Sequence, residues 1–184
     1  LQKREGMAAR ALEFLTLCAS RSGEVRGATW NELEGWDRDN PLWTIPAKRM
    51  KAEKEHQVPL TPEAVAILNA LPRNPESPYV FWAPRGGMLS DMTLSAVMRR
   101  MQEAAEAKGE KGWLDRVSKR PAVPHGLRST FRDWVSERTD YPRDMAEIAL
   151  AHTVGSEAER AYRRGNMLAK RRALMADWAA FLNG

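Results

Sequence analysis

The sequence predicts a mostly α-helical domain with a small antiparallel β-sheet near its N-terminal end. Two observations predict this class. Apolar residues recur at helical spacing through most of the chain, beginning with 6–19. Only a few short segments carry the β-branched and aromatic residues that are typical of strands. The 184 residues suit one domain over 1–184 and suffice to bury a hydrophobic core.

The sheet is expected to include a hairpin. Its two clearest strands are 42–46 and 56–60, and 28–33 is a candidate third strand before a turn over 37–41. The loop between the clear strands is polar and basic. We therefore expect a hairpin whose tip carries four cations: Lys48, Arg49, Lys51 and Lys54.

Helices are expected to dominate the rest of the chain. Thr61 and Pro62 form a helix start signal, with threonine as the N-cap and proline at the first helical position, and that helix is expected to end at Leu71. A polar connection over 108–124 precedes the His125 region. The other predicted helical segments are 6–19, 24–26, 91–107, 125–138, 144–150, 157–163 and 166–182.

Composition favours a polyanionic partner. The formal net charge is +5, and a basic balance is typical of proteins that bind nucleic acid. The single cysteine, Cys18, lies in an apolar run, so we expect a core residue in a reducing cytoplasm rather than a nucleophile. No stretch approaches the roughly 20 apolar residues that span a bilayer, so no membrane association is expected.

Histidines, arginines and one tyrosine form the candidate site. His125 and Arg128 are three residues apart, which puts them on one face of a helix. His152 stands where an apolar helix meets a turn of small residues. Positive charge favours the ionised form of a phenol, which would help a tyrosine act as a nucleophile. One tyrosine has such neighbours, since Tyr162 stands among Arg160, Arg163 and Arg164.

Each feature also has an ordinary explanation: a solvated helix face, a histidine that caps a helix, and a surface tyrosine in cation–π contact. Together, however, these groups suit phosphoryl transfer, because arginines hold non-bridging phosphate oxygens while histidines and a lysine move protons. The three histidines are far apart in sequence and lie near no cysteine or carboxylate at ligand spacing, so neither a metal nor a cofactor is expected.

The order of these groups along the chain resembles that of the tyrosine recombinases, and the local sequence around each group is similar to that of phage-type integrases. Segment 20–26 resembles the box of the first catalytic arginine, Arg21, with its acidic neighbour Glu24. Segments 45–51 and 56–60 resemble the hairpin of the catalytic lysine, for which Lys51 is the best match and Lys48 the second. The remaining boxes match at His125, Arg128, His152 and Tyr162.

The resemblance implies a DNA breaking-rejoining fold and assigns the catalytic roles. Tyr162 attacks the scissile phosphate, Arg21 and Arg128 hold its non-bridging oxygens, and His152 donates a further hydrogen bond. Lys51 protonates the leaving 5′-oxygen, and His125 is the general acid/base near the tyrosine. Further DNA contacts are expected from Lys48, Arg49, Arg163 and Arg164.

The resemblance also implies the setting of the reaction, namely integration or excision of a mobile element. The partners would be double-stranded DNA attachment sites, a homotetramer assembled on DNA, and accessory DNA-bending or directionality factors in a bacterial nucleoid. The chain is then expected to be the C-terminal catalytic domain of a longer protein. Type IB topoisomerase activity, a DNA-binding module without catalysis and a metal-independent nuclease are the alternatives.

Overall fold

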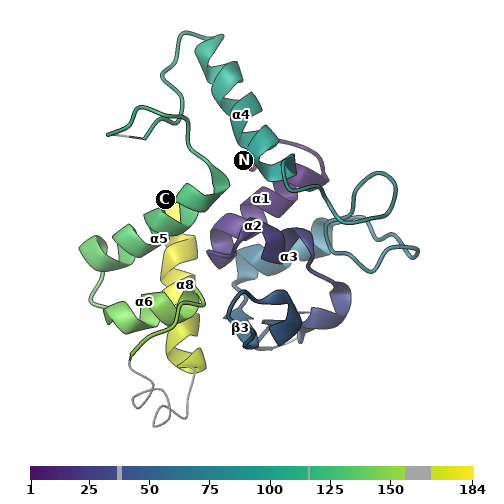
Figure 1. Ribbon diagram of the computed structural model, residues 1–184, viewed down its shortest axis with the longest axis vertical. Coiled ribbons are helices and arrows are strands. Elements are labelled where there is room, and N and C mark those ends of the chain that lie inside the picture. The colour runs from purple at the N-terminus through teal and green to yellow at the C-terminus, as the bar shows by residue number, and fades with distance from the viewer. Residues whose placement is uncertain (37–38, 116, 156–166) are drawn as a thin grey trace.

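The computed structural model describes residues 1–36, 39–115, 117–155 and 167–184 (Figure 1). Helices make up about half of the described part and far outweigh its strands, as the sequence predicts, and the sheet is three-stranded and antiparallel in the order β1-β2-β3. The predicted helix over 157–163, and with it Tyr162, lies outside the described residues. The helices are α1 (Met7–Cys18), α2 (Ser22–Arg26), α3 (Pro62–Ala70), α4 (Thr93–Glu106), α5 (Pro124–Arg138), α6 (Arg143–Ala149) and α8 (Leu168–Asn183).

The hairpin is confirmed, but the third strand lies later than expected. Strand β2 (Leu42–Ile45) pairs with β3 (His56–Pro59), and β1 is only Leu33–Glu34. The expected strand over 28–33 is wrong because Trp30–Glu32 forms a 3₁₀ helix. Near the start of the expected strand, Thr29 forms an isolated β-bridge with Tyr79, which is distant in sequence, and does not pair with β2.

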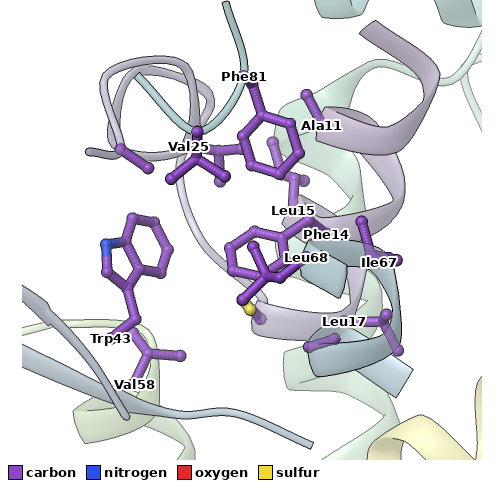
Figure 2. Packing of buried hydrophobic residues seen from close by; sticks show 14 of the residues in the cluster. Ala11, Phe14, Leu15, Leu17, Val25, Trp43, Val58, Ile67, Leu68 and Phe81 are labelled. Atoms are coloured by element: carbon purple, nitrogen blue, oxygen red, sulfur yellow. The ribbon is translucent and has the colours of Figure 1, made fainter. Parts of the chain in front are cut away.

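Helix α1 is the centre of the first hydrophobic core. It contacts α2, α3, α4, α5 and α8. The ring of Phe14 lies between Trp43 of the sheet and Phe81, with centroids 5.5 and 5.4 Å away (Figure 2). Cys18 is buried here, and burial raises the pKa of its thiol far above the ordinary value. This helix therefore joins the sheet to the helical layer around it.

A second core fills the space between α5, α6 and α8, which lie together on one side of the molecule (Figure 1). Its aromatic centre is Trp178 of α8, whose ring lies 5.3 Å from Phe131 and 5.1 Å from Trp134 between centroids. The indole N–H of Trp178 donates to the Thr16 carbonyl at 2.8 Å. That bond fastens the second core to α1.

Helix termini follow from local sequence. Thr61 caps α3 as predicted, accepting a hydrogen bond from the Ala64 N–H at 3.4 Å. Helices α1 and α6 both end at an alanine in the left-handed conformation, Ala19 with φ 48° and Ala151 with φ 53°. The next N–H donates five residues back in both cases, Ser20 to Leu15 at 3.2 Å and His152 to Glu147 at 2.9 Å. These bonds close a Schellman turn at each helix end.

Candidate active site

Arg128 lies where the two cores meet and is the best-buried of the predicted site residues that the structure describes, with 4% of its surface exposed. Its Nη1 donates to the Ala19 carbonyl at 2.6 Å, and its Nη2 donates to the Leu150 carbonyl at 2.5 Å. Those carbonyls belong to the C-terminal turns of α1 and α6. Helix C-termini carry partial negative charge, so the guanidinium is held in a fixed orientation and neutralises two helix ends.

The pKa of Arg128 reflects this crowded site. Burial and, to a smaller extent, the positive charge of Arg21 lower the pKa to about 10, although Glu24 and Glu147 act in the opposite direction. The side chain is still protonated at neutral pH. Two arginines and two carboxylates thus lie within electrostatic range of one another, which suits the binding of a phosphate anion.

Glu24 holds Arg21 by both its backbone and its side chain. The backbone N–H of Arg21 donates to Oε2 of Glu24 at 2.7 Å, and Nη1 donates to Oε1 at 2.8 Å. The carboxylate is buried, whereas 29% of the Arg21 side chain is exposed. An acidic residue at the third position of α2 therefore starts the helix and orients the arginine beside it.

Arg49 is turned inward and anchors the hairpin. Its Nη2 donates to the Glu24 carbonyl at 2.5 Å, and its Nη1 pairs with Glu32, which also accepts from the Trp43 indole N–H at 3.0 Å. A Cβ at Gly27 would stand 2.8 Å from Nη2, so only glycine leaves the guanidinium its space. This arrangement supports a structural role for an arginine that the sequence assigns to DNA.

The two lysine candidates lie on the loop between β2 and β3. Lys48 belongs to the 3₁₀ turn Ala47–Arg49, and Lys51 follows the buried Met50; both lysines are exposed. Within the part of the chain that the structure describes, Lys51 forms no ion pair. Its ammonium is therefore available to a ligand.

His152 contacts Arg128 from the end of α6. Its Nε2 lies 3.4 Å from Nη2 of Arg128, and its Nδ1 lies 2.6 Å from Oε2 of Glu147. The structure thus brings together Arg21, Arg128 and His152, which the sequence predicts as one site. Sequence reasoning missed Glu147; the available signal was an acidic residue five positions before a histidine at a helix end.

His56 approaches the same helix end from the sheet. Its Nε2 donates to the Ala149 carbonyl at 3.2 Å. Burial lowers the pKa of His56 to about 4, and the positive charges of Arg171 and Arg128 act in the same direction. The ring is therefore neutral at pH 7. The partner of His56 is a backbone carbonyl one residue before the one that Arg128 binds.

The remaining predicted residues are placed only in part. His125 is exposed in the first turn of α5, one helical turn before Arg128. Tyr162, Arg163 and Arg164 lie outside the described residues. In the described ranges, no three His, Cys, Asp or Glu side chains gather closely enough to hold a metal ion. The described ranges also contain no helix that is long and apolar enough to cross a membrane.

Comparison with known proteins decides the family. The model of the phage integrase family matches residues 3–168. The chain belongs to the phage integrase family. It is 35% identical over 167 residues to prophage integrase IntA of Escherichia coli K12, covering 89% of this chain and 36% of that protein. It is 29% identical to the integrase of Shigella phage Sf6, covering 94% and 41%. The chain thus spans less than half the length of these curated relatives.

Two solved structures share the fold of this integrase-family chain. XerA recombinase aligns with a TM-score of 0.53 at 16% identity, covering 91% of this chain and 61% of that one. A lambda integrase tetramer bound to a Holliday junction aligns with a TM-score of 0.54 at 18% identity, covering 84% and 41%. The predicted family and the recombinase catalytic-domain fold are both confirmed.

Proposed function

We propose that this chain is the catalytic part of a site-specific recombinase that integrates or excises a mobile element by cutting and rejoining DNA without a metal ion. The convergence of Arg21, Arg128 and His152 at the junction of the two cores carries the proposal. Membership of the phage integrase family supports it and favours recombination over topoisomerase activity or binding without catalysis.

The first step is attack of the Tyr162 oxygen on the scissile phosphorus. The bond to the 5′-oxygen breaks, which leaves a 3′-phosphotyrosine and a free 5′-hydroxyl. Arg21 and Arg128 hold the non-bridging oxygens, and His152 donates to the same group. Donors fixed before the reaction stabilise developing charge without reorganising, and the two carbonyls around Arg128 supply that fixation.

Protons move through two further side chains. Lys51 donates a proton to the leaving 5′-oxygen, and its exposed place on the β2–β3 loop supports closure over bound DNA. His125, near the start of α5, takes up the proton of the tyrosine. In the second step a 5′-hydroxyl of another strand attacks the phosphotyrosine, so the phosphodiester is restored without an external energy source.

The partner we propose is double-stranded DNA at attachment sites, bound by a homotetramer with help from DNA-bending or directionality factors in a bacterial nucleoid. One solved relative in fold is a lambda integrase tetramer on a Holliday junction, and another is a dimer on a core site. Lys48, Arg163 and Arg164 are the proposed phosphate contacts, whereas the inward pairing of Arg49 supports anchoring of the hairpin.

Loss of Arg21 tests this proposal. Arg21→Ala removes one fixed donor, so cleavage of nicked duplexes should fall about 10²- to 10³-fold. DNA binding, which draws on many phosphate contacts, should change far less. The matched control is Arg10→Ala, which breaks another i,i+3 ion pair, Arg10–Glu13, of similar length and exposure. Cleavage by Arg21→Ala at the wild-type rate would contradict the assignment.

A further inference from the structure

The turn that ends α6 brings an acidic side chain against the predicted catalytic histidine. In a Schellman turn, the third residue from the helix end and the second residue beyond it lie together, and an apolar contact usually joins them. Here those positions are Glu147 and His152. The backbone N–H of His152 donates to the Glu147 carbonyl at 2.9 Å, and the left-handed Ala151 closes the turn. The backbone therefore fixes where the two side chains meet.

The carboxylate of Glu147 binds two partners from opposite sides. Oε2 lies 2.6 Å from Nδ1 of His152, and Oε1 accepts from Nε of Arg132 on α5 at 2.7 Å. Burial raises the pKa of Glu147, but the hydrogen bonds from His152 and Arg132 outweigh it and leave the pKa below its ordinary value. The carboxylate is therefore ionised at neutral pH and held in one orientation.

These contacts define which ring nitrogen of His152 carries the proton. An ionised carboxylate only accepts hydrogen bonds, so Nδ1 of the ring must carry a hydrogen. Arg128 only donates, so Nε2 turns its lone pair toward Nη2, 3.4 Å away. While no phosphate is bound, these two contacts place a proton on Nδ1 and leave Nε2 as the acceptor. To donate to a phosphate oxygen, Nε2 must gain a proton, and the resulting cation lies between the cationic Arg128 and the anionic Glu147.

We propose that Glu147 is the positioning residue for His152: it fixes the ring with Nδ1 protonated and compensates the charge that the ring gains when Nε2 donates to the phosphate. Arg132 supports it by holding the second carboxylate oxygen. The groups around the ring come from α5 (Arg128 and Arg132) and α6 (Glu147), with the Arg21–Glu24 pair of α2 beyond Arg128. The role in catalysis rests on the proposed function.

The first test needs no DNA and measures directly which nitrogen of the His152 ring carries the proton. Nitrogen-15 NMR of the histidine-labelled chain distinguishes the two neutral ring forms, at a pH above the titration observed for the ring. We expect Nδ1–H at His152 in the wild type and in Glu147→Gln, whose amide oxygen still accepts. We expect a mixture of the two forms in Glu147→Ala, with thermal unfolding as the check of folding. An unchanged Nδ1–H form in folded Glu147→Ala would overturn the proposal.

The second test measures cleavage of nicked duplexes. At metal sites, loss of the partner that orients a ligating histidine typically costs about 10- to 100-fold in activity. Glu147 holds His152 in the same way, so we expect a loss of that order in Glu147→Ala. Glu147→Gln keeps the proton on Nδ1 but lacks the negative charge of the carboxylate. It should therefore cleave faster than Glu147→Ala and slower than the wild type, and its rate should fall furthest below that of the wild type at high pH. Glu103→Ala, which breaks an exposed ion pair with Arg99 on α4, is the control.

The two proposals fail in different ways. If the wild type forms no covalent DNA product, the proposed function fails, while the dependence of the ring form on Glu147 still stands as measured without DNA. If the wild type cleaves and Glu147→Ala cleaves at the same rate with the same ring form, only the role of Glu147 is wrong.

Discussion

His56 and Arg128 show how single residues stabilise the end of α6. The Ala149 carbonyl accepts from His56, and the next carbonyl, that of Leu150, accepts from Arg128. Carbonyls in the last turn of a helix have no partner within the helix. Two side chains, one from the sheet and one from α5, therefore complete the helix that positions His152.

The lowered pKa of His56 makes stability depend on pH. The folded state holds the ring neutral down to about pH 4, whereas the ring titrates near 6.5 when the chain unfolds. The unfolded state thus binds a proton first, and stability is lost as pH falls from 6.5 to about 4. The shift corresponds to about 3 kcal/mol at pH 4.

The measurement is urea unfolding of the wild type and His56→Gln at pH 7 and pH 4. Glutamine keeps an N–H donor for Ala149 but does not titrate, so the difference between the two proteins isolates the histidine. We expect the wild type to lose about 3 kcal/mol more than the variant between the two pH values. Equal losses would mean that His56 binds its proton equally well in both states.

At the residue scale, the sequence predicts those candidate site residues that are recognisable from their type and their spacing. The His125–Arg128 spacing and the position of His152 at a helix end suffice to propose those residues. Arg49 shows the limit. A basic loop suggests solvent and DNA, but the carboxylate that Arg49 pairs with, Glu32, is 17 residues earlier in the chain. Only the packing of the hairpin on α2 reveals that pairing.

At the scale of an element, the left-handed end of α6 is a point of strain. Ala151 has φ 53°, a conformation that is unfavourable for every residue except glycine by about 1 kcal/mol or more. Ala151→Gly should therefore stabilise the fold by about 1 kcal/mol or somewhat less, since glycine also makes the unfolded chain more flexible. Thermal or urea unfolding measures the change.

The matched control is Ala104→Gly, within α4. Alanine there has helical geometry, so the same substitution should destabilise the fold by about 1 kcal/mol. Two substitutions of the same type are thus expected to have opposite signs. Destabilisation by both would show that the turn does not hold Ala151 in the left-handed region.

The connection after α4 depends on one buried side chain. Gln102 donates to the Lys111 carbonyl at 3.0 Å and accepts from the Trp113 N–H at 2.7 Å. The sequence predicts 108–124 only as a polar connection. The structure shows a bridge between Leu114 and Pro121 there. A single bridge is too short to produce a periodic pattern in the sequence. The connection is stabilised by Gln102, which lies on α4.

Gly112 is the position at which that support can be removed. A Cβ there would stand 2.3 Å from Oε1 of Gln102, so Gly112→Ala must displace the glutamine and break both of its bonds to the connection. Gly109→Ala is the control, because Gly109 also has positive φ but has open space around it. Hydrogen exchange at the Trp113 and Ala122 amides should speed up at least tenfold more in Gly112→Ala than in Gly109→Ala. Equal exchange in both would contradict the role of Gln102.

Element prediction succeeds where the signal is local and fails where the partner is distant. Neighbouring residues suffice to predict the Thr61 cap of α3 and the helical periodicity of α1 and α8. Each of these three helices begins and ends within two residues of its predicted bounds. The third strand was misplaced by a few residues because the bridge from Thr29 to Tyr79 depends on a segment 50 positions away.

At the scale of the whole molecule, the site lies on the junction between two cores. Arg21 is the N-cap of α2 beside the first core, whereas Arg128 lies on α5 and His152 follows α6, two helices of the second core. The bonds from Arg128 to Ala19 and from Trp178 to Thr16 join the two halves. The geometry of the candidate site is therefore a property of the folded whole, which explains why the sequence suggests its members but not their contacts.

The central claim is that the chain cuts DNA by forming a covalent bond through Tyr162. The most direct measurement uses a pool of nicked duplexes of randomised sequence, in which the strand end diffuses away after cleavage and traps the adduct. The wild type is compared with Tyr162→Phe and Tyr141→Phe on a denaturing gel. Tyr141 is the control, because its hydroxyl donates to Asp177 at 2.6 Å and that bond raises its pKa to about 12, which makes it a poor nucleophile.

We predict an adduct with the wild type and with Tyr141→Phe, none with Tyr162→Phe, and a DNA-linked peptide that contains Tyr162 after proteolysis. An adduct that survives in Tyr162→Phe would show that another residue is the nucleophile. DNA binding by the wild type without any adduct would contradict the recombinase mechanism for this chain.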